Sequence, residues 1–286
     1  MTFEWGTRTF VMGIVNVTPD SFSGDGVTSV EAAVAQGIQM EMNGADVLDI
    51  GGESTRPRST PVSLREELDR VIPIIEQLAQ TVQIPLSIDT YKAEVAARAI
   101  EAGASIINDV WGGRMEPEIL RVAAEKNATI ILMHNRSMPK DAAQEERLGG
   151  RYVGVEYADL IGDIKKELQE QIAMARAAGV PNENIIVDPG IGFGKTVEQN
   201  LELVRRLDEI KALGYPLLVG PSRKSFVGYT LNLPPEERLE GTAAAVALCI
   251  DRGADMVRVH DVQAMVRVAA LSDAVVRSHT AIHRHP

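Results

Sequence analysis

The sequence predicts a single-domain α/β protein of the (β/α)8, or TIM-barrel, class. Eight apolar runs are each followed by a stretch with helical periodicity, and polar or glycine-rich residues come directly after nearly every run. A length of 286 residues suits one barrel domain better than two average domains. The apolar runs are Phe10–Val17, Val47–Ile50, Leu86–Ile88, Ser105–Val110, Ile130–Met133, Ile185–Val187, Pro216–Val219 and Met256–Val259. We expect one domain over residues 1–286, with its core from about 10 to 277 and a flexible tail over 278–286.

Local patterns predict the individual elements. Several apolar runs are continuous rather than alternating, which is typical of parallel strands buried on both faces. Apolar residues at three- and four-residue spacing predict helices over Val30–Met42 and Leu64–Val82, the second with Ser63 as its N-cap and Glu66 three residues later. A glycine that ends a helix and a small residue that leads into the next strand recur at Gly44-Ala45-Asp46, Gly103-Ala104-Ser105 and Gly253-Ala254-Asp255.

Two internal connections lack such a pattern. Ser54–Pro61 and Arg136–Gly150 are therefore expected to be the least ordered internal segments. The charge run Glu145–Arg147 within the second segment is interpreted as a solvated helix face.

Composition narrows the class of protein. The hydrophobic content of 45% is enough for a full core, and the net charge is 29 − 40 = −11. An acidic surface argues against nucleic acids and anionic membranes as partners, although a local basic cluster can still bind an anionic substrate. The single cysteine, Cys249, excludes an intramolecular disulfide and is interpreted as a small buried hydrophobe rather than a nucleophile. Met1–Phe10 lacks a signal-peptide core and no run approaches the length of a membrane span, so we expect a soluble cytoplasmic protein.

The first strand runs into a long glycine-rich loop. The segment Gly13–Gly26 reads GIVNVTPDSFSGDG, and a loop of this kind suits a lid or a ligand-gated role. Asn16 and Asp20 offer hard oxygen atoms of the kind that Mg²⁺ prefers. A strand-end cap at Asn16 and a local turn at Asp20 explain the same residues equally well.

The second strand ends in the segment DIGGESTRP, Asp49–Pro57. Gly51-Gly52 allows a sharp turn or a close approach of the backbone to a ligand. Ser54, Thr55 and Arg56 then supply two hydroxyls and a guanidinium fork, which favours planar anions such as carboxylate and phosphate.

Acids and amides end several other predicted strands. Because the carboxyl ends of barrel strands meet at one mouth, these side chains are expected to converge there. A carboxylate at such a position can accept two parallel hydrogen bonds from the N–H pair of a guanine-like or pterin ring, although helix capping or pairing with a lysine would also satisfy it. The residues are Asp49, Asp89, Asn108 and Asp188.

The run DPGIGFGKT, Asp188–Thr196, matches neither the GxxxxGK[ST] nor the GxGxxG pattern, so no nucleotide-binding loop is assigned. Phe193 within it suits either a stacking wall or loop packing.

The last two predicted strands end in a basic cluster. Gly220–Ser225 and Arg258–Asp261 occupy the positions where barrels often bind phosphate. Arg223, Lys224 and Arg258 therefore indicate an anionic substrate or leaving group, and His260 is either a phosphate donor or a packed histidine.

Seven ordered motifs together resemble those of the dihydropteroate synthase family. They are GIVNVTPDSFS, DIGGESTRP, SIDTYK, INDVWGG, DPGIGFGK, GPSRKSF and RVHD, and they extend from about Phe10 to Asp261. The resemblance implies a parallel eight-stranded barrel, usually a homodimer. It also implies a transferase that joins 6-hydroxymethyl-7,8-dihydropterin pyrophosphate to p-aminobenzoate for folate synthesis, with pyrophosphate as the leaving group. Sulfonamides would then be competitive ligands.

The resemblance also implies roles for matching residues. The pterin would be bound by Asp89, Asn108, Asp188, Phe193, Lys224 and Arg258, with Arg258 stacked on the ring. Pyrophosphate would contact Asn16, Thr55, Arg258 and His260, and Asn16 would be the ligand of the Mg²⁺ cofactor. The p-aminobenzoate pocket would comprise Phe22, Thr55, Arg56, Pro57, Phe193, Ser222 and Lys224. The residues with catalytic roles would be Asn16, Asp20, Lys224, Arg258 and His260.

One departure from the family pattern concerns the first loop, where SFSGDGV replaces the commoner SFSDGG order and shifts Asp25 by one position.

Three alternative functions explain part of the sequence. A pterin-binding methyltransferase shares the acidic positions but does not need Thr55-Arg56-Pro57 together with Ser222-Arg223-Lys224. A homologue without catalysis is expected to lack some of Asn16, Arg258 and His260. A phosphate-binding sugar-isomerase barrel explains the basic cluster but not the acids.

Overall fold

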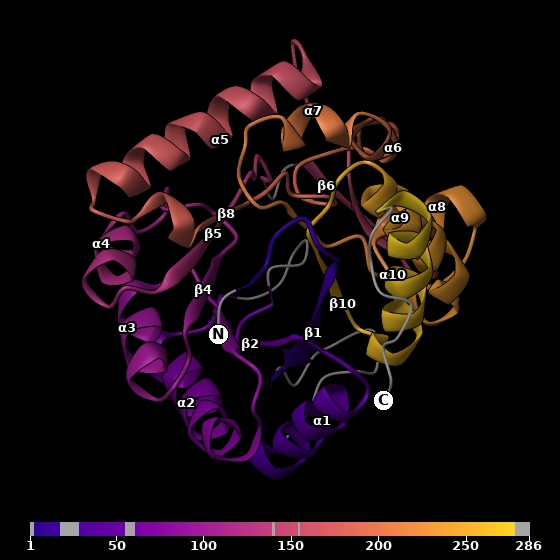
Figure 1. Cartoon of the computed structure of the whole chain (residues 1–286). Helices are drawn as coiled ribbons and strands as arrows, with labels where there is room; N and C mark the ends of the chain where they lie inside the picture. The colour runs from indigo at the N-terminus through magenta and orange to yellow at the C-terminus, as the bar shows by residue number, and fades with distance from the viewer. Residues whose placement is uncertain (1–2, 18–28, 55–60, 139–140, 154, 278–286) are drawn as a thin grey trace.

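The predicted barrel is confirmed by the computed structural model, which describes residues 3–17, 29–54, 61–138, 141–153 and 155–277. Eight parallel strands form one sheet in the order β8-β5-β4-β3-β2-β1-β10-β9. A single parallel bridge between Val187 and Leu217 joins the first and last of these strands and closes the ring (Figure 1). The strands are β1 Phe10–Asn16, β2 Val47–Gly51, β3 Leu86–Asp89, β4 Ile106–Asp109, β5 Thr129–Met133, β8 Ile185–Asp188, β9 Leu218–Val219 and β10 Met256–Val259.

Helices surround the strands on the outside of the ring (Figure 1). They are α1 Val30–Met42, α2 Leu64–Thr81, α3 Ala93–Glu101, α4 Glu118–Glu125, α5 Leu160–Ala177, α6 Val197–Arg205, α7 Leu207–Lys211, α8 Ser225–Leu231, α9 Leu239–Asp251 and α10 Val262–Val276, with 3-10 turns at Asn182–Asn184 and Pro235–Glu237. The predicted N-cap is confirmed, because the Ser63 hydroxyl accepts the backbone N–H of Glu66 at the start of α2. None of the described helices combines the length and apolarity of a membrane span, and the cytoplasmic location stays a prediction.

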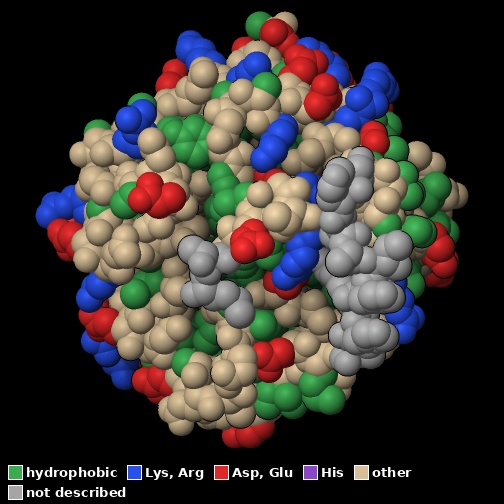
Figure 2. Space-filling view, viewed as in Figure 1, with side chains coloured by type: hydrophobic (Ala, Val, Ile, Leu, Met, Phe, Trp, Pro, Cys, Tyr) green, Lys and Arg blue, Asp and Glu red, His purple; other side chains and the backbone are tan. Residues whose placement is uncertain are grey.

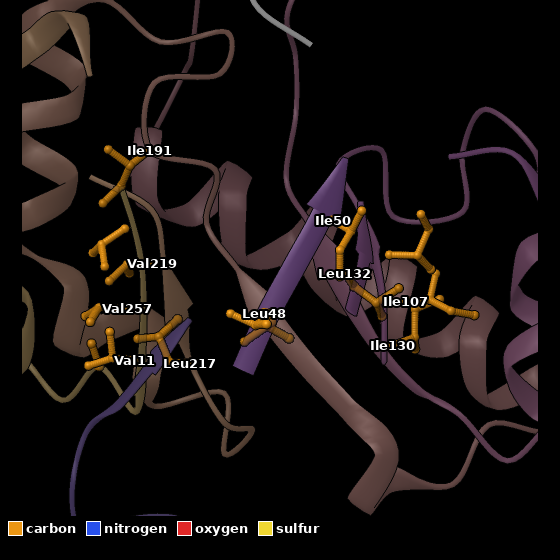
Figure 3. Close-up of a cluster of buried hydrophobic side chains, with 14 of the residues drawn as sticks. Val11, Leu48, Ile50, Ile107, Ile130, Leu132, Ile191, Leu217, Val219 and Val257 are labelled. Atoms are coloured by element: carbon orange, nitrogen blue, oxygen red, sulfur yellow. The ribbon is translucent and has the colours of Figure 1, made fainter. Parts of the chain in front are cut away.

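The core has two apolar layers because successive strand residues point to opposite faces. Outward side chains such as Leu48, Ile107 and Val257 pack between the strands and the helices (Figure 3). Inward side chains, including Phe10, pack inside the barrel, where Phe3 lies against them with its ring centroid 4.9 Å from that of Phe10. The inward layer is Phe10, Met12, Val47, Ile106, Ile131, Ile186, Leu218 and Met256. The amino-terminal end of the barrel is thereby filled with apolar side chains.

A polar layer lies directly above this apolar layer. On four strands, a polar residue follows two positions after an inward apolar residue. Because side chains along a strand alternate between its two faces, this polar side chain also points to the inside of the barrel. The four steps are Val47 to Asp49, Ile106 to Asn108, Ile186 to Asp188 and Met256 to Arg258. These side chains therefore surround the carboxyl-terminal mouth of the barrel.

The expectation for Arg136–Gly150 is wrong in part. An antiparallel hairpin, β6 Ala142–Glu145 and β7 Gly149–Tyr152, occupies much of this connection, so Glu145–Arg147 is not a helix face. The hairpin is anchored to distant residues, because Tyr229 on α8 donates to the Gly149 carbonyl and Arg147 donates to the Asn232 carbonyl, at 3.1 and 2.8 Å. These contacts compensate for the shortness and polarity of its strands.

The surface mixes charges of both signs. On the face drawn in Figure 2, Lys and Arg side chains alternate with Asp and Glu side chains around the rim. Cys249 is fully buried in α9, which confirms its interpretation as a core residue.

Candidate active site

The polar layer is organised around the guanidinium of Arg258. Its Nε donates to Asp49 Oδ2 over 2.6 Å, and its Nη2 donates to Asp89 Oδ2 over 2.7 Å. The Asn108 amide donates to the same Asp49 oxygen over 2.9 Å. The strand register makes this possible, because Arg258 and Asp49 flank β1 opposite Met12 and Ile14, respectively. Residues from β2, β3, β4 and β10 thus form one connected group.

Burial sets the electrostatics of this group. The Asp89 side chain is removed from water, which raises its pKa to about 7 even though the Arg258 charge opposes that rise. Burial also lowers the pKa of Arg258, but the Asp49 and Asp89 carboxylates outweigh that effect and hold the pKa above its usual value. Arg258 therefore stays charged. Asp49 Oδ1 is buried and has no hydrogen-bond partner within the described part of the chain.

Asp188 faces the same mouth from β8. Its Oδ1 accepts the backbone N–H of Gly190 over 2.7 Å. Burial raises its pKa to about 6, and the Gly190 N–H and the charge of Lys224 oppose this rise. A carboxylate held in this way can accept hydrogen bonds from a ligand when it is ionised.

Lys224 and Phe193 bring two loops together beside Asp188. The Lys224 ammonium lies 3.9 Å from the centroid of the Phe193 ring, which is a cation–π contact. Gly192 adopts a φ of +81°, and a Cβ there would lie 2.7 Å from Lys224 Cδ. The glycine therefore lets the lysine stem cross the loop that follows β8.

Ser222 and His260 connect the ends of the last two strands. The Ser222 hydroxyl oxygen lies 2.9 Å from His260 Nδ1 and accepts the His260 backbone N–H over 3.2 Å. If the hydroxyl donates to Nδ1, the Nε2 atom carries the proton of the neutral ring and can donate to an anion.

Arg223, which the sequence places in the basic cluster, is paired with an acid. Arg223 forms a bidentate pair with Asp261, with N–O distances of 3.0 and 2.7 Å. The place of Arg223 in the basic cluster stays a prediction.

Of the other predicted site residues, Asn16 lies within the described ranges and six lie outside them. Asn16 is the last residue of β1, lies opposite Gly51 and is partly exposed. Within the described ranges, no three His, Cys, Asp or Glu residues are grouped as a metal site, so Asn16 would need ligands from a substrate or water to hold Mg²⁺. The predictions for Asp20, Phe22, Asp25, Thr55, Arg56 and Pro57 concern residues outside the described ranges.

Two structural features were missed from the sequence. Asp49 was noted as a strand-end acid, but its role in holding both Arg258 and Asn108 was not predicted. Lys195 received no role, although it is only 2% exposed and lies within DPGIGFGKT. Its position directly before the Thr196–Gln199 capping box, which fixes the start of α6, was the available signal.

The comparisons with known proteins agree with this geometry. The family described as "Pterin binding enzyme" matches residues 12–260. The chain therefore belongs to the family of pterin-binding enzymes, and the resemblance found in its motifs is confirmed. It is 52% identical over 277 residues to a dihydropteroate synthase from Synechocystis, which covers 96% of this chain and 93% of the relative.

Two solved structures extend the similarity. A Clostridium difficile dihydropteroate synthase, determined in the presence of pteroic acid, is 45% identical with a TM-score of 0.87 and covers 96% of this chain and 100% of the other. A Yersinia pestis dihydropteroate synthase in a sulfonamide complex is 40% identical with a TM-score of 0.88 and covers 98% of this chain and 100% of the other.

Proposed function

We propose that this chain acts as a dihydropteroate synthase. It joins 6-hydroxymethyl-7,8-dihydropterin pyrophosphate to p-aminobenzoate and releases 7,8-dihydropteroate and pyrophosphate. The observation that carries the proposal is the polar layer of Asp49, Asn108, Asp188 and Arg258 at the barrel mouth, in a chain about half identical to enzymes of this name.

The pterin would bind within this layer. Ionised Asp188 would accept two N–H groups of the ring, and Asn108 and Asp89 would contact its other polar edge. Arg258 is already fixed at its edge by Asp49 and Asp89, so the flat face of its guanidinium would stack on the ring. Lys224 and Phe193 would form the wall between the pterin and the p-aminobenzoate pocket.

The chemistry would depend mainly on charge neutralisation. The electron-rich pterin can delocalise positive charge on the carbon that loses pyrophosphate, so a dissociative path needs stabilisation of the leaving group. Arg258 and the Nε2–H of His260 would bind the departing oxygens. The aryl amine is neutral near pH 7 and attacks without prior deprotonation, so we expect neither a covalent enzyme intermediate nor an essential general base.

Magnesium would complete the binding of the leaving group. Asn16 offers one partly exposed amide oxygen at the end of β1, which fits a cation that keeps waters and takes its other ligands from phosphates. When bound, Mg²⁺ would supply positive charge against the pyrophosphate.

A homodimer is the proposed assembly, and α9 and α10 offer a surface for it. The two helices pack against each other at one side of the barrel (Figure 1). They expose large apolar side chains, with Leu248 56%, Leu271 70% and Val275 75% exposed. A second copy that covers this face would remove that apolar surface from water. Light scattering of the wild type and of Leu271→Glu tests this, and a monomeric wild type contradicts it.

A coupled pyrophosphate assay tests the activity. Pyrophosphate release should require both the dihydropterin pyrophosphate and p-aminobenzoate, and a sulfonamide should compete with the latter. A pterin-binding methyltransferase or a homologue without catalysis would release no pyrophosphate when p-aminobenzoate is added. That result would overturn the proposal.

A further inference from the structure

Lys195 is one of the largest side chains that are buried in the described part of the chain. Its ammonium lies 3.0 Å from the carbonyl oxygen of Gly190, 3.0 Å from that of Phe193 and 3.1 Å from Nδ1 of His134. All three partners are neutral, because burial and the Lys195 charge lower the pKa of His134 to about 3. Burial lowers the pKa of Lys195 itself to about 7, although the charges of Asp188 and Glu167 oppose this fall. Placing an amino group here is therefore costly, and its three polar contacts give it a role that an apolar side chain would not fill.

The two carbonyls belong to the loop that builds the candidate site. Gly190 donates its N–H to Asp188 Oδ1, and the ring of Phe193 receives the Lys224 ammonium. The loop contains Gly190, Gly192 and Gly194 at φ values of +71°, +81° and +56°. A backbone with three glycines in this region has many alternative conformations, so a fixed hydrogen-bond donor inside the loop restricts it strongly.

The position of the ammonium is itself fixed from outside the loop. Nδ1 of His134 accepts from Lys195, which places the ring proton on Nε2. His134 Nε2 lies 3.1 Å from Glu167 Oε2 on α5, although the two groups are not aligned as a regular hydrogen bond. Arg136 holds the other oxygen of Glu167 through its Nε over 2.7 Å. The loop is therefore connected through Lys195 to α5 on the outside of the barrel.

We infer that Lys195 is a positioning residue for the pterin: it holds the backbone of the glycine loop so that Asp188 and Phe193 face the bound ring. This inference rests on the proposed function. Lys195 acts through Gly190 and Phe193 and contacts no substrate, so its loss should weaken pterin binding more than it slows the chemical step.

The test compares Lys195→Met with Asp273→Ala. Methionine fills a similar volume but leaves both carbonyls and His134 Nδ1 without their donor. Asp273 on α10 is also buried and accepts the Thr9 backbone N–H and hydroxyl over 2.8 and 2.7 Å, but Thr9 directly precedes β1, at the end of the barrel opposite the mouth. Asp273→Ala therefore controls for a loss of stability alone.

Calorimetry with the dihydropterin pyrophosphate gives the decisive measurement. For Lys195→Met we expect the dissociation constant and KM for this substrate to rise by about tenfold or more, with a smaller fall in kcat. Asp273→Ala should lower the melting temperature and leave the dissociation constant unchanged.

The outcomes separate the inference from the proposed function. If the wild type does not bind the pterin, the proposed function fails. If the wild type binds and Lys195→Met binds within about twofold of it, the positioning role is wrong while the function stands. If Lys195→Met does not fold, Lys195→Leu, which likewise lacks a hydrogen-bond donor, is measured against the same criterion.

Discussion

Arg258 donates its Nε hydrogen to Asp49 Oδ2 over 2.6 Å, although the two residues are 209 positions apart in the sequence. Asp49 is fully buried, and the same oxygen also accepts the amide of Asn108. One carboxylate thus fixes two side chains that are expected to contact the pterin. We therefore regard Asp49 as the residue that holds the polar layer together.

Replacing Asp49 tests this relationship. Asp49→Ala removes one of the two carboxylates that the Arg258 guanidinium is seen to hydrogen-bond, and it removes the acceptor of the Asn108 amide. The free energy of unfolding should fall by about 3–5 kcal/mol, as for other buried pairs that lose one partner. Urea unfolding measures this loss, and calorimetry should show weakened pterin binding.

A suitable control for Asp49 is Asp46→Ala. Asp46 also pairs with an arginine, since Arg8 Nη1 donates to it over 2.9 Å, but this pair is partly exposed and precedes β2 at the opposite end of the barrel. Its loss should destabilise the protein less and leave pterin affinity unchanged. Equal effects of the two substitutions on affinity would show that Asp49 does not organise the site.

Asp188→Ala tests the direct pterin contact. The ring N–H pair would lose a charged acceptor, so binding should weaken by about 2–5 kcal/mol in calorimetry. Unchanged pterin affinity would overturn the assignment of Asp188.

The pH dependence of binding should report the ionisation of Asp188. Burial raises its pKa from 3.8 to about 6, and only the ionised form can accept both N–H groups of the ring. Pterin affinity should therefore rise from about pH 5 to about pH 7. The stability of the unliganded protein should change in the opposite direction. The raised pKa contributes stability that is fully present below 3.8 and is lost as the pH rises through about 6.

Asp188→Asn provides the comparison for this pH profile. The amide cannot ionise, so the part of the affinity change that belongs to Asp188 should disappear. Asp89, with a pKa raised to about 7 by burial, would retain a smaller dependence near neutral pH. Superimposable profiles for the wild type and Asp188→Asn would assign the titration to another group.

Much of the fold was predictable because its signals are local. The eight apolar runs, the helix over Val30–Met42 and the Ser63 cap each depend on residues within a few positions of one another. The convergence of Asp49, Asn108 and Asp188 was also predictable, because parallel strands in a barrel share one mouth. Their partners were not predictable, since the pairing of Arg258 with Asp49 and Asp89 depends on strand register and rotamer. The hairpin over β6 and β7 was missed for a similar reason, because contacts with α8 stabilise it.

Removal of divalent cations tests the proposed Mg²⁺. Excess EDTA should abolish pyrophosphate release, and added Mg²⁺ should restore it, because Asn16 supplies only one neutral oxygen and the leaving group carries several negative charges. Asn16→Ala should raise the Mg²⁺ concentration needed for half-maximal rate. Full activity in excess EDTA would remove the metal from the mechanism.

Gly190→Ala tests whether the loop after β8 tolerates any side chain. Gly190 has a φ of +71°, and a Cβ there would lie 1.9 Å from the carbonyl oxygen of His134. Two backbone segments would have to separate, and the N–H that holds Asp188 and the carbonyl that holds Lys195 would move with them. We expect a loss of more than about 4 kcal/mol in the free energy of unfolding, together with lost pterin binding.

Gly149→Ala is a matched control, because Gly149 has the same φ of +71° with no atom within 4 Å of its ideal Cβ. It carries the backbone strain alone, which costs about 1–2 kcal/mol for a left-handed alanine. The difference between the two variants in urea unfolding therefore isolates the contact with His134. If the two variants lose the same free energy of unfolding, the loop relaxes around the new methyl group. In that case, the close approach of the two backbone segments does not fix the position of Asp188.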